Sequence, residues 1–277
     1  MLDNFYYGCI QKWSRGSLER QPEPEMTMEG AGEVDEYEKA ADFGTFQANL
    51  ELYAEEILSL APERGRVLDI GCGPAALLCR LAECAPGLDF TGIDLSEKMV
   101  QRARHRAHRL SLKNVRIEKQ DALNMRFDSG FDLIFSTNFI HQLLAPDMAS
   151  KVVRDALRLL NPGGMLMLID LERTKSERSA PWFAKKFALP VGRTFYTSTL
   201  NSLRAAYSFD EFERILIDAG WKDFDHYHPS FFNFFQLACS RAPRKKVRIK
   251  RRFNSFSARL YYHLLRIYLP RRPHATQ

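Results

Sequence analysis

The sequence predicts an α/β protein built on one doubly wound, mostly parallel sheet of seven strands with an antiparallel hairpin at its end. Strand-like apolar runs alternate with helical runs between residues 66 and 172. Such alternation is typical of right-handed βαβ units, whose strands pair in parallel. Two more strand-like runs follow a last helix, joined by Pro229 and Ser230, and this spacing indicates an antiparallel hairpin.

Each element has its own signal. Leu50, Tyr53, Ile57 and Leu60 fall on one face of a helix that begins near Phe46. Strands are expected at 66–70, 89–94, 115–121, 131–138, 165–172, 222–228 and 231–239, and helices at 75–85, 97–110, 146–160 and 211–220. Ser96 can cap the helix that follows it, and Ser208 and Glu211 form a capping box before a helix that ends at Gly220. The "NPGG" before the fifth strand is expected to be a turn, and residues 173–207 have no clean period and are expected to be irregular.

The chain divides into a core with appendages. Of its 277 residues, 1–44 are expected to form an N-terminal extension, 45–240 the core with a substrate-side insertion at 173–207, and 241–277 a basic tail. The start lacks a basic leader followed by a long apolar core, so we expect no secretory signal and a cytoplasmic location. Five cysteines form no CxxC pair and no metal-like spacing, which favours free thiols and no metal site.

Charge is distributed unevenly along the chain. The net charge is +6, but the residues from Arg241 onward hold twelve Lys or Arg and no Asp or Glu, so the rest sums to about −6. Phe253, Phe256, Leu260, Leu264 and Ile267 lie on one helical stripe in this tail. Such a helix could bind an anionic membrane surface, could bind RNA through phosphates, or could pack against its own core or a partner.

The stretch "VLDIGCGPA" predicts a ligand-binding turn. Gly71 and Gly73 allow backbone to approach a ligand closely where the first strand ends. Asp94 lies 21 residues after Gly73 and ends the second strand, where a carboxylate can bind both hydroxyls of a ribose. A dinucleotide is the rival ligand, but its third glycine is replaced here by Ala76. Asp69 also suits a cationic ligand better than a diphosphate.

Together with "GIDLS", "QDALNM", "FDLIFSTNFIHQL" and "LNPGGMLMLID", this stretch resembles the class I S-adenosylmethionine-dependent methyltransferases from Val67 to Asp170. The resemblance implies a Rossmann-like fold and S-adenosylmethionine as cofactor. It places Asp69, Gly71, Cys72 and Gly73 at the methionine end, with Asp69 near the ammonium group, and Asp94 at the ribose. Leu95 and Met99 would flank the adenine, Asp121 and Ala122 would bind its amino edge, and Asn138 would lie near the transferable methyl. For the residues themselves, Asp94 and Asp121 as caps and Cys72 as a packing residue remain open alternatives.

Methyl transfer is an in-line displacement that needs alignment and a dry site, and a general base only for a protonated acceptor. His141, three residues past Asn138, is the candidate base, and a structural histidine is the alternative. His226 and His228 are expected to be structural. "STNF" stands where methyltransferases of nucleic acid bases or glutamine keep an "NPPY"-type motif, which disfavours those substrates.

The acceptor is therefore expected to be a small or lipid-like molecule methylated at O, C or N. Alternatives are an RNA methyltransferase guided by the tail and a non-catalytic cofactor-binding protein. A set of aromatic side chains in the extension and the insertion could wall a dry acceptor pocket. They are Tyr37, Phe43, Phe46, Trp182, Phe183, Phe187, Phe195, Tyr196 and Tyr207.

Overall fold

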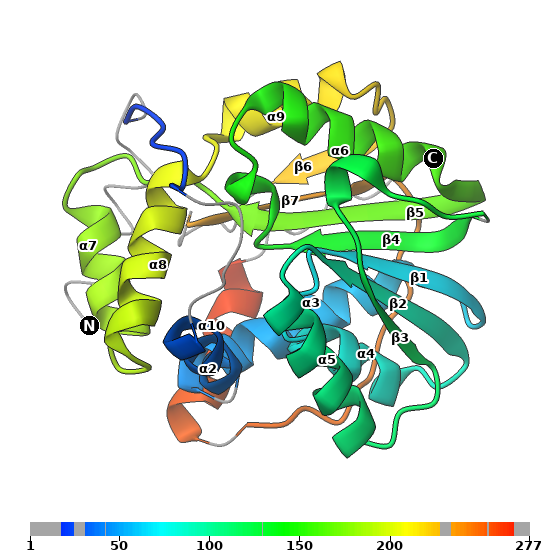
Figure 1. Cartoon of the computed structure of the whole chain (residues 1–277), viewed down its shortest axis with the longest axis horizontal. Coiled ribbons are helices and arrows are strands. Elements are labelled where there is room, and N and C mark those ends of the chain that lie inside the picture. Colours follow the sequence, from blue (N-terminus) through cyan, green and yellow to red (C-terminus); the bar gives the residue numbers. More distant parts are fainter. Residues whose placement is uncertain are drawn as a thin grey trace.

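The computed structural model describes residues 18–24, 31–41, 43–128, 130–227, 234–253 and 255–268. Its centre is a seven-stranded sheet of order β3-β2-β1-β4-β5-β7-β6 (Figure 1). The strands are β1 (Gly65–Ile70), β2 (Leu88–Asp94), β3 (Val115–Lys119), β4 (Phe131–Thr137), β5 (Leu160–Leu171), β6 (Phe224–Tyr227) and β7 (Phe235–Ser240). The neighbours from β3 to β5 pair in parallel, whereas β7 is antiparallel to both β5 and β6. The predicted fold class is confirmed.

Helices cover both faces and one end of the sheet. The α-helices are α2 (Ala31–Ala40), α3 (Gly44–Leu60), α4 (Ala76–Cys84), α5 (Glu97–Arg109), α6 (Pro146–Arg158), α7 (Ser179–Phe183), α8 (Arg193–Ala205), α9 (Phe209–Asp218) and α10 (Phe256–Tyr268). Short 3-10 turns η1 (Ala122–Asn124) and η2 (Ile140–Gln142) follow β3 and β4, and a π-helical turn η3 (Ala184–Ala188) follows α7. In Figure 1, α6 and α9 lie on one face, α3, α4 and α5 on the other, and α2, α7 and α8 at one end.

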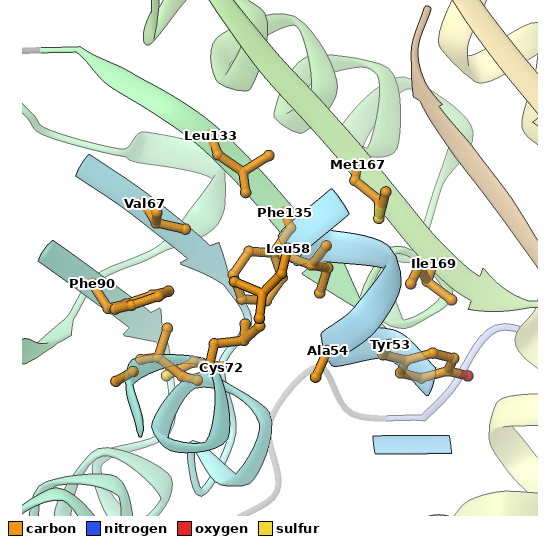
Figure 2. Close-up of a cluster of buried hydrophobic side chains, with 14 of the residues drawn as sticks. Tyr53, Ala54, Leu58, Val67, Cys72, Phe90, Leu133, Phe135, Met167 and Ile169 are labelled. Carbon is orange, nitrogen blue, oxygen red and sulfur yellow. The ribbon is translucent and has the colours of Figure 1, made fainter. Parts of the chain in front are cut away.

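Alternation along the strands creates two apolar cores. Val67 and Phe135 point to the face covered by α3, α4 and α5, where Leu58 meets them (Figure 2). Leu68 and Ile134, one residue out of step, face α6 and α9. Both faces of the central strands are thus buried, which is why these strands read as continuous apolar runs.

The helix boundaries follow the predicted caps. The Ser96 side chain accepts a hydrogen bond from the Met99 backbone N–H at 3.3 Å. Ser208 and Glu211 form the reciprocal capping box before α9, with distances of 3.4 and 2.9 Å. Gly220 follows that helix with φ +88°, a left-handed conformation that glycine adopts without strain.

Two predictions about local structure were wrong. Residues 173–207 are mostly helical. The buried face of α8 is composed largely of small residues, including Ser198, Thr199 and Ser202, rather than of large apolar ones. A search for large apolar residues at helical spacing misses such a face. The "NPGG" segment lies inside β5, where pairing with β4 is irregular between Phe131 and Leu133. Gly163 there has φ +79°, so the segment bends while the strand continues.

The basic tail packs along α3 and α4. Arg244 pairs with Glu56, Arg251 with Glu55 and Arg252 with Glu83. Tyr262 of α10 is fully buried, and its hydroxyl donates to Glu55 Oε2 at 2.5 Å. Of the three alternatives for the tail, the structure shows packing against the core for the side of the tail that faces α3 and α4.

The described members of the predicted stripe divide between two environments, since Phe253 packs against the core whereas two residues of α10 are exposed. Phe256 and Leu260 are 82% and 50% exposed, whereas Ala258 and Tyr262 are buried. The side chains of Leu264 and Ile267 lie outside the described set. Among the described residues, no helix combines the length and apolarity needed to cross a bilayer.

Candidate functional site

The loop after β1 bends sharply at two glycines. Gly71 and Gly73 have φ values of +73° and +52°. A Cβ on Gly71 would lie 2.5 Å from the ring of Phe139, so the close packing of this ring requires glycine. A Cβ on Gly73 would have no heavy atom within 4 Å, and Gly73 instead lines the large chamber described below. The two glycines therefore serve different purposes, one for packing and one for backbone exposed to a ligand.

Asp94 connects this loop to the end of β2. Its Oδ2 accepts a hydrogen bond from the Gly73 N–H at 2.9 Å, and its Oδ1 accepts one from the Ser96 N–H at 2.9 Å. Each carboxylate oxygen has a second lone pair, so the residue can hold the loop and still accept from a diol. The capping alternative and the binding role are thus compatible at this residue.

A small hollow lies beside Asp94, on the side predicted for the adenine. It brings together Gly71, Asp94, Leu95, Asp121 and Ala122 with Phe139 and Gln142, and its volume is about 20 Å³. That is the space of roughly one water molecule, so a purine needs the side chains of this hollow to move apart. Asp121 Oδ1 also caps η1 by accepting from the Leu123 N–H at 2.8 Å.

A larger chamber of about 270 Å³ opens from the same loop. Cys72, Gly73, Met99, Asn138 and His141 line it together with side chains of α2, α3, α8 and α10. Met99 thus contacts this chamber rather than the adenine-side hollow. Asn138 has φ +52°, and its N–H donates to the Ile169 carbonyl at 2.8 Å, which turns the chain at the end of β4.

Two buried oxygen atoms favour a cationic ligand here. Asp69 Oδ1 and Asn49 Oδ1 are buried without a hydrogen-bond partner in the described structure. Burial and the neighbouring charge of Asp94 raise the pKa of Asp69 well above its ordinary value. An ammonium group nearby would stabilise the ionised form. Asn49 lines the large chamber, whereas Asp69 lies behind the loop and is not among the lining residues.

Asn49 is a residue that sequence reasoning missed. It occurs on α3 between Phe46 and Tyr53, which also line the chamber. A polar side chain on an otherwise apolar helical face was the available signal.

Cys72 packs closely against the backbone of Gly92. If Gly92 carried a Cβ, that atom would lie 2.9 Å from Cys72 Sγ. Burial, reinforced by Asp69 and Asp94, raises the pKa of its thiol, so Cys72 is a neutral wall residue rather than a nucleophile.

His141 is fixed by Asp170, the last buried acid of β5. Its Nδ1 lies 2.5 Å from Asp170 Oδ1, and its backbone N–H donates to Asp170 Oδ2 at 2.8 Å. On the other side of the ring, Nε2 lies 3.5 Å from Glu23 Oε1. The histidine is 2% exposed and lines the large chamber. Asp170 thus holds the orientation of an imidazole that borders the chamber.

The charges around His141 compete. Burial lowers the pKa of His141, but the charge and hydrogen bond of Asp170 and the charge of Glu23 outweigh it, while Arg20 opposes them. The net result is a pKa above the ordinary 6.5. The imidazolium therefore persists to higher pH here than in a free histidine.

The aromatic wall differs in part from the expectation. Tyr37, Phe46, Phe183 and Phe195 line the chamber as expected. Tyr53, Phe234, Phe235 and Tyr261 also line it and were not anticipated. The other expected wall residues, Phe43, Trp182, Phe187, Tyr196 and Tyr207, lie outside the lining. Two of them pack against rings that do line the chamber. The ring centroid of Trp182 lies 6.4 Å from that of Phe234, and the ring centroid of Phe187 lies 4.7 Å from that of Phe183.

His226 lies on β6 of the terminal hairpin. His226 stacks on Phe209 with ring centroids 3.7 Å apart, and its Nε2 lies 3.2 Å from Gln236 Oε1. It does not line the chamber. His228 lies outside the described residues.

Fold and site together define a protein that binds a nucleoside-type cofactor at the carboxyl ends of parallel strands. A family described as "Methyltransferase domain" matches residues 62–219. A malonyl-[acyl-carrier protein] O-methyltransferase of Geobacter sulfurreducens is 31% identical over 198 residues, which are 69% of this chain and 72% of the relative. The 27-O-demethylrifamycin SV methyltransferase of Amycolatopsis mediterranei is 34% identical over 157 residues, 56% of this chain, and this chain covers only about half (53%) of that relative.

Solved structures share the fold. A SAM-dependent methyltransferase from Aquifex aeolicus aligns with a TM-score of 0.55 and 21% identity over 75% of this chain and 97% of its own. The plantazolicin methyltransferase BamL, solved with a desmethylPZN analog and SAH, aligns with a TM-score of 0.54 and 20% identity. The alignment covers 74% of this chain and 73% of BamL. The chain belongs to the methyltransferase-domain family, among the enzymes that use S-adenosylmethionine as cofactor.

Proposed function

We propose that this protein transfers a methyl group to a hydroxyl of a small, largely apolar acceptor. The observation that carries the proposal is the His141–Asp170 pair, whose ring faces a chamber walled by aromatic side chains. Carbon and nitrogen acceptors need no such base when they arrive as free nucleophiles, whereas an alcohol or phenol does. The base therefore favours oxygen over the other two atoms.

S-adenosylmethionine supplies, when bound, an activated methyl group whose S–C bond breaks as the bond to the acceptor oxygen forms. Asp69 and Asn49 would bind its ammonium group, Asp94 its ribose, and Asp121 with Ala122 the edge of its adenine. His141 would take the hydroxyl proton at Nε2, and Asp170 would hold the ring with Nδ1–H donating to it. Aromatic side chains of α2, α3 and α8 would exclude water from the reacting atoms.

The names of two relatives agree with an oxygen acceptor. They are the O-methyltransferases of the malonyl-acyl carrier protein and of a rifamycin. A third, from Caenorhabditis elegans, is a 2-methoxy-6-polyprenyl-1,4-benzoquinol methylase, 26% identical over 66% of this chain. The third name does not say which atom is methylated, so the three relatives support a small or lipid-like acceptor and only two of them support oxygen.

The direct test supplies the protein with S-adenosylmethionine and matched acceptors. Each phenol or alcohol is paired with the amine of the same skeleton, and S-adenosylhomocysteine formation is measured. Turnover of the hydroxyl member above its amine partner is the expected result. Preference for the amines would refute oxygen transfer, and cofactor binding without product from any pool of cell-extract metabolites would support a non-catalytic binding protein.

We further propose a cytoplasmic enzyme whose α10 rests on an anionic bilayer surface. Phe256 and Leu260 are exposed one helical turn apart, with Arg259 and His263 exposed on the same face. In the preceding segment, Lys246, Arg248 and Lys250 are exposed, alternating with the half-buried Val247 and Ile249. Apolar side chains flanked by cations match an anionic interface, where each nearby Lys or Arg adds about 1 kcal/mol. Tyr261 on the other side of α10 lines the chamber, which would place the acceptor site near that surface.

A further inference from the structure

Glu23 faces the imidazole of His141 from a distant part of the sequence. Its Oε1 lies 3.5 Å from His141 Nε2, and the Ser202 hydroxyl of α8 donates to the same Oε1 at 2.6 Å. Glu23 is only 9% exposed. With Asp170 at Nδ1, the ring lies between two carboxylates, one from β5 and one from the N-terminal extension. This second carboxylate is not required for a histidine base to be oriented, so it calls for a separate role.

The segment 18–24 that carries Glu23 is anchored next to the site by Arg20. The guanidinium donates to the carbonyls of Ala205, Leu144, His141 and Leu143 at 2.6, 2.8, 2.9 and 2.7 Å. It also lies 4.1 Å from the centroid of the Tyr207 ring. The Gln21 N–H donates to the Arg204 carbonyl at 3.1 Å. The position of Glu23 is therefore set by the backbone around η2 and the end of α8.

Glu23 and an acceptor hydroxyl would compete for the same atom. A base must offer a lone pair at Nε2, yet a carboxylate beside Nε2 stabilises the form of the ring in which that nitrogen carries a proton. Asp170 on β5 acts in the same direction, and Arg20, on the segment of Glu23, acts against both. Nε2 has no hydrogen bond to any described residue, so its nearest carboxylate is held at ion-pair distance rather than in a closed hydrogen bond. A carboxylate so placed can be displaced by a hydroxyl that makes the shorter contact.

We propose that Glu23 is a positioning residue that sets the pH at which His141 becomes a base, and that the acceptor hydroxyl takes the place of its carboxylate at Nε2. The inference deepens the proposed function and rests on His141 acting as the base. It makes the N-terminal extension part of the catalytic control of the site. Below the titration midpoint of His141 the ion pair with Glu23 persists, and above it Nε2 is free for the acceptor.

The test is an NMR titration of the His141 ring in the full-length protein with S-adenosylhomocysteine added, comparing wild type with Glu23→Gln. Glutamine keeps the size and the hydrogen bond from Ser202 but removes the charge. The midpoint is expected to fall towards that of a free histidine. In steady-state assays, kcat/KM of Glu23→Gln is expected to rise several-fold at pH values below the wild-type midpoint and to match wild type well above it. A merely structural role would lower activity at every pH instead.

Glu19→Gln is the matched control, because Glu19 lies in the same segment with its side chain exposed. It should leave the midpoint unchanged. If Glu23→Gln fails to fold, Ser202→Ala tests the same contact by removing the hydroxyl that holds Oε1. An unchanged His141 midpoint in the folded variants overturns the inference. Failure of the proposed function has a different signature, since full activity in His141→Gln would refute the base without altering the titration of wild-type His141.

Discussion

Asp170 binds both the ring and the backbone of His141, through Oδ1 to Nδ1 at 2.5 Å and through Oδ2 from the N–H at 2.8 Å. A single carboxylate at the end of β5 thereby fixes the position of η2 and the orientation of the imidazole at once. Because Asp170 is itself 1% exposed, this pair is screened from solvent. The relationship joins η2, which follows β4, to the end of β5.

Replacing Asp170 by Asn is expected to shift the acidic limb of the pH–rate profile to lower pH and to lower the maximal rate. The charge of Asp170 raises the pKa of His141 against the effect of burial, so its removal favours the neutral ring. The raised pKa also means that His141 stabilises the fold below about pH 6.5 and that this contribution is lost as pH rises through the raised value. A pH series of kcat/KM and of thermal unfolding checks both effects. An unmoved limb would show that another group controls it.

His141→Gln is expected to lower kcat by roughly 10²–10⁴-fold, the usual contribution of a general base, while cofactor affinity stays the same. A phenol acidic enough to be ionised at assay pH serves as the control acceptor, because it needs no base and should lose much less activity. Isothermal calorimetry with S-adenosylhomocysteine separates binding from chemistry. Equal losses for ionised and neutral acceptors would contradict the role of a base.

Asp94→Ala is expected to weaken cofactor binding by about 1–3 kcal/mol, the cost of losing buried hydrogen bonds to a charged group. The change removes the lone pairs offered to the ribose and also the contact that holds the Gly73 N–H. Asp89→Ala on the same strand is the control, because Asp89 is exposed at the other end of β2. Calorimetric titration measures both variants, and undiminished affinity in Asp94→Ala would remove this residue from the site.

Tyr262→Phe is expected to lower the free energy of unfolding by about 1–3 kcal/mol, because Glu55 loses a buried hydroxyl donor at 2.5 Å. Glu55 is 7% exposed and, among the described residues, would keep its pairing with Arg251. Chemical denaturation provides the measurement. Phe256→Ser, on the exposed face of the same helix, should change stability little, so a similar loss in both variants would mean that α10 is not docked as described.

A double substitution, Phe256→Ser with Leu260→Ser, is expected to reduce co-sedimentation with vesicles that contain anionic lipid. Both side chains are exposed and would enter the interface, where apolar area and nearby cations act together. Vesicles of neutral lipid should bind weakly in either case. Binding to RNA that falls steeply with salt, without binding to vesicles, would instead assign the basic segment to phosphates of nucleic acid.

The sequence was informative where one residue type had one reason to be present. The paired glycines of the bend and the capping box of α9 were predicted by number, since turns and caps each demand particular residues. The ribose-binding role of Asp94 stays a prediction. The sequence was uninformative where burial depends on a partner far along the chain. Glu23 meets His141 across 118 positions, and no local pattern in the "QPEPE" segment announces it. Asn49 and the small-residue face of α8 were missed because their neighbours, not their spacing, make them lining residues.

The wall of the aromatic chamber includes Tyr37 on α2 and Tyr261 on α10, which lie far apart in the sequence. Both lie outside residues 62–219, the range that the family match covers. Grafting residues 62–219 into another member of the family should therefore transfer the glycine bend and its acids but only part of the chamber wall, since Phe183 and Phe195 lie inside this range whereas Tyr37 and Tyr261 lie outside it. New acceptors can arise by exchanging the two termini while the glycine bend and its acids stay untouched.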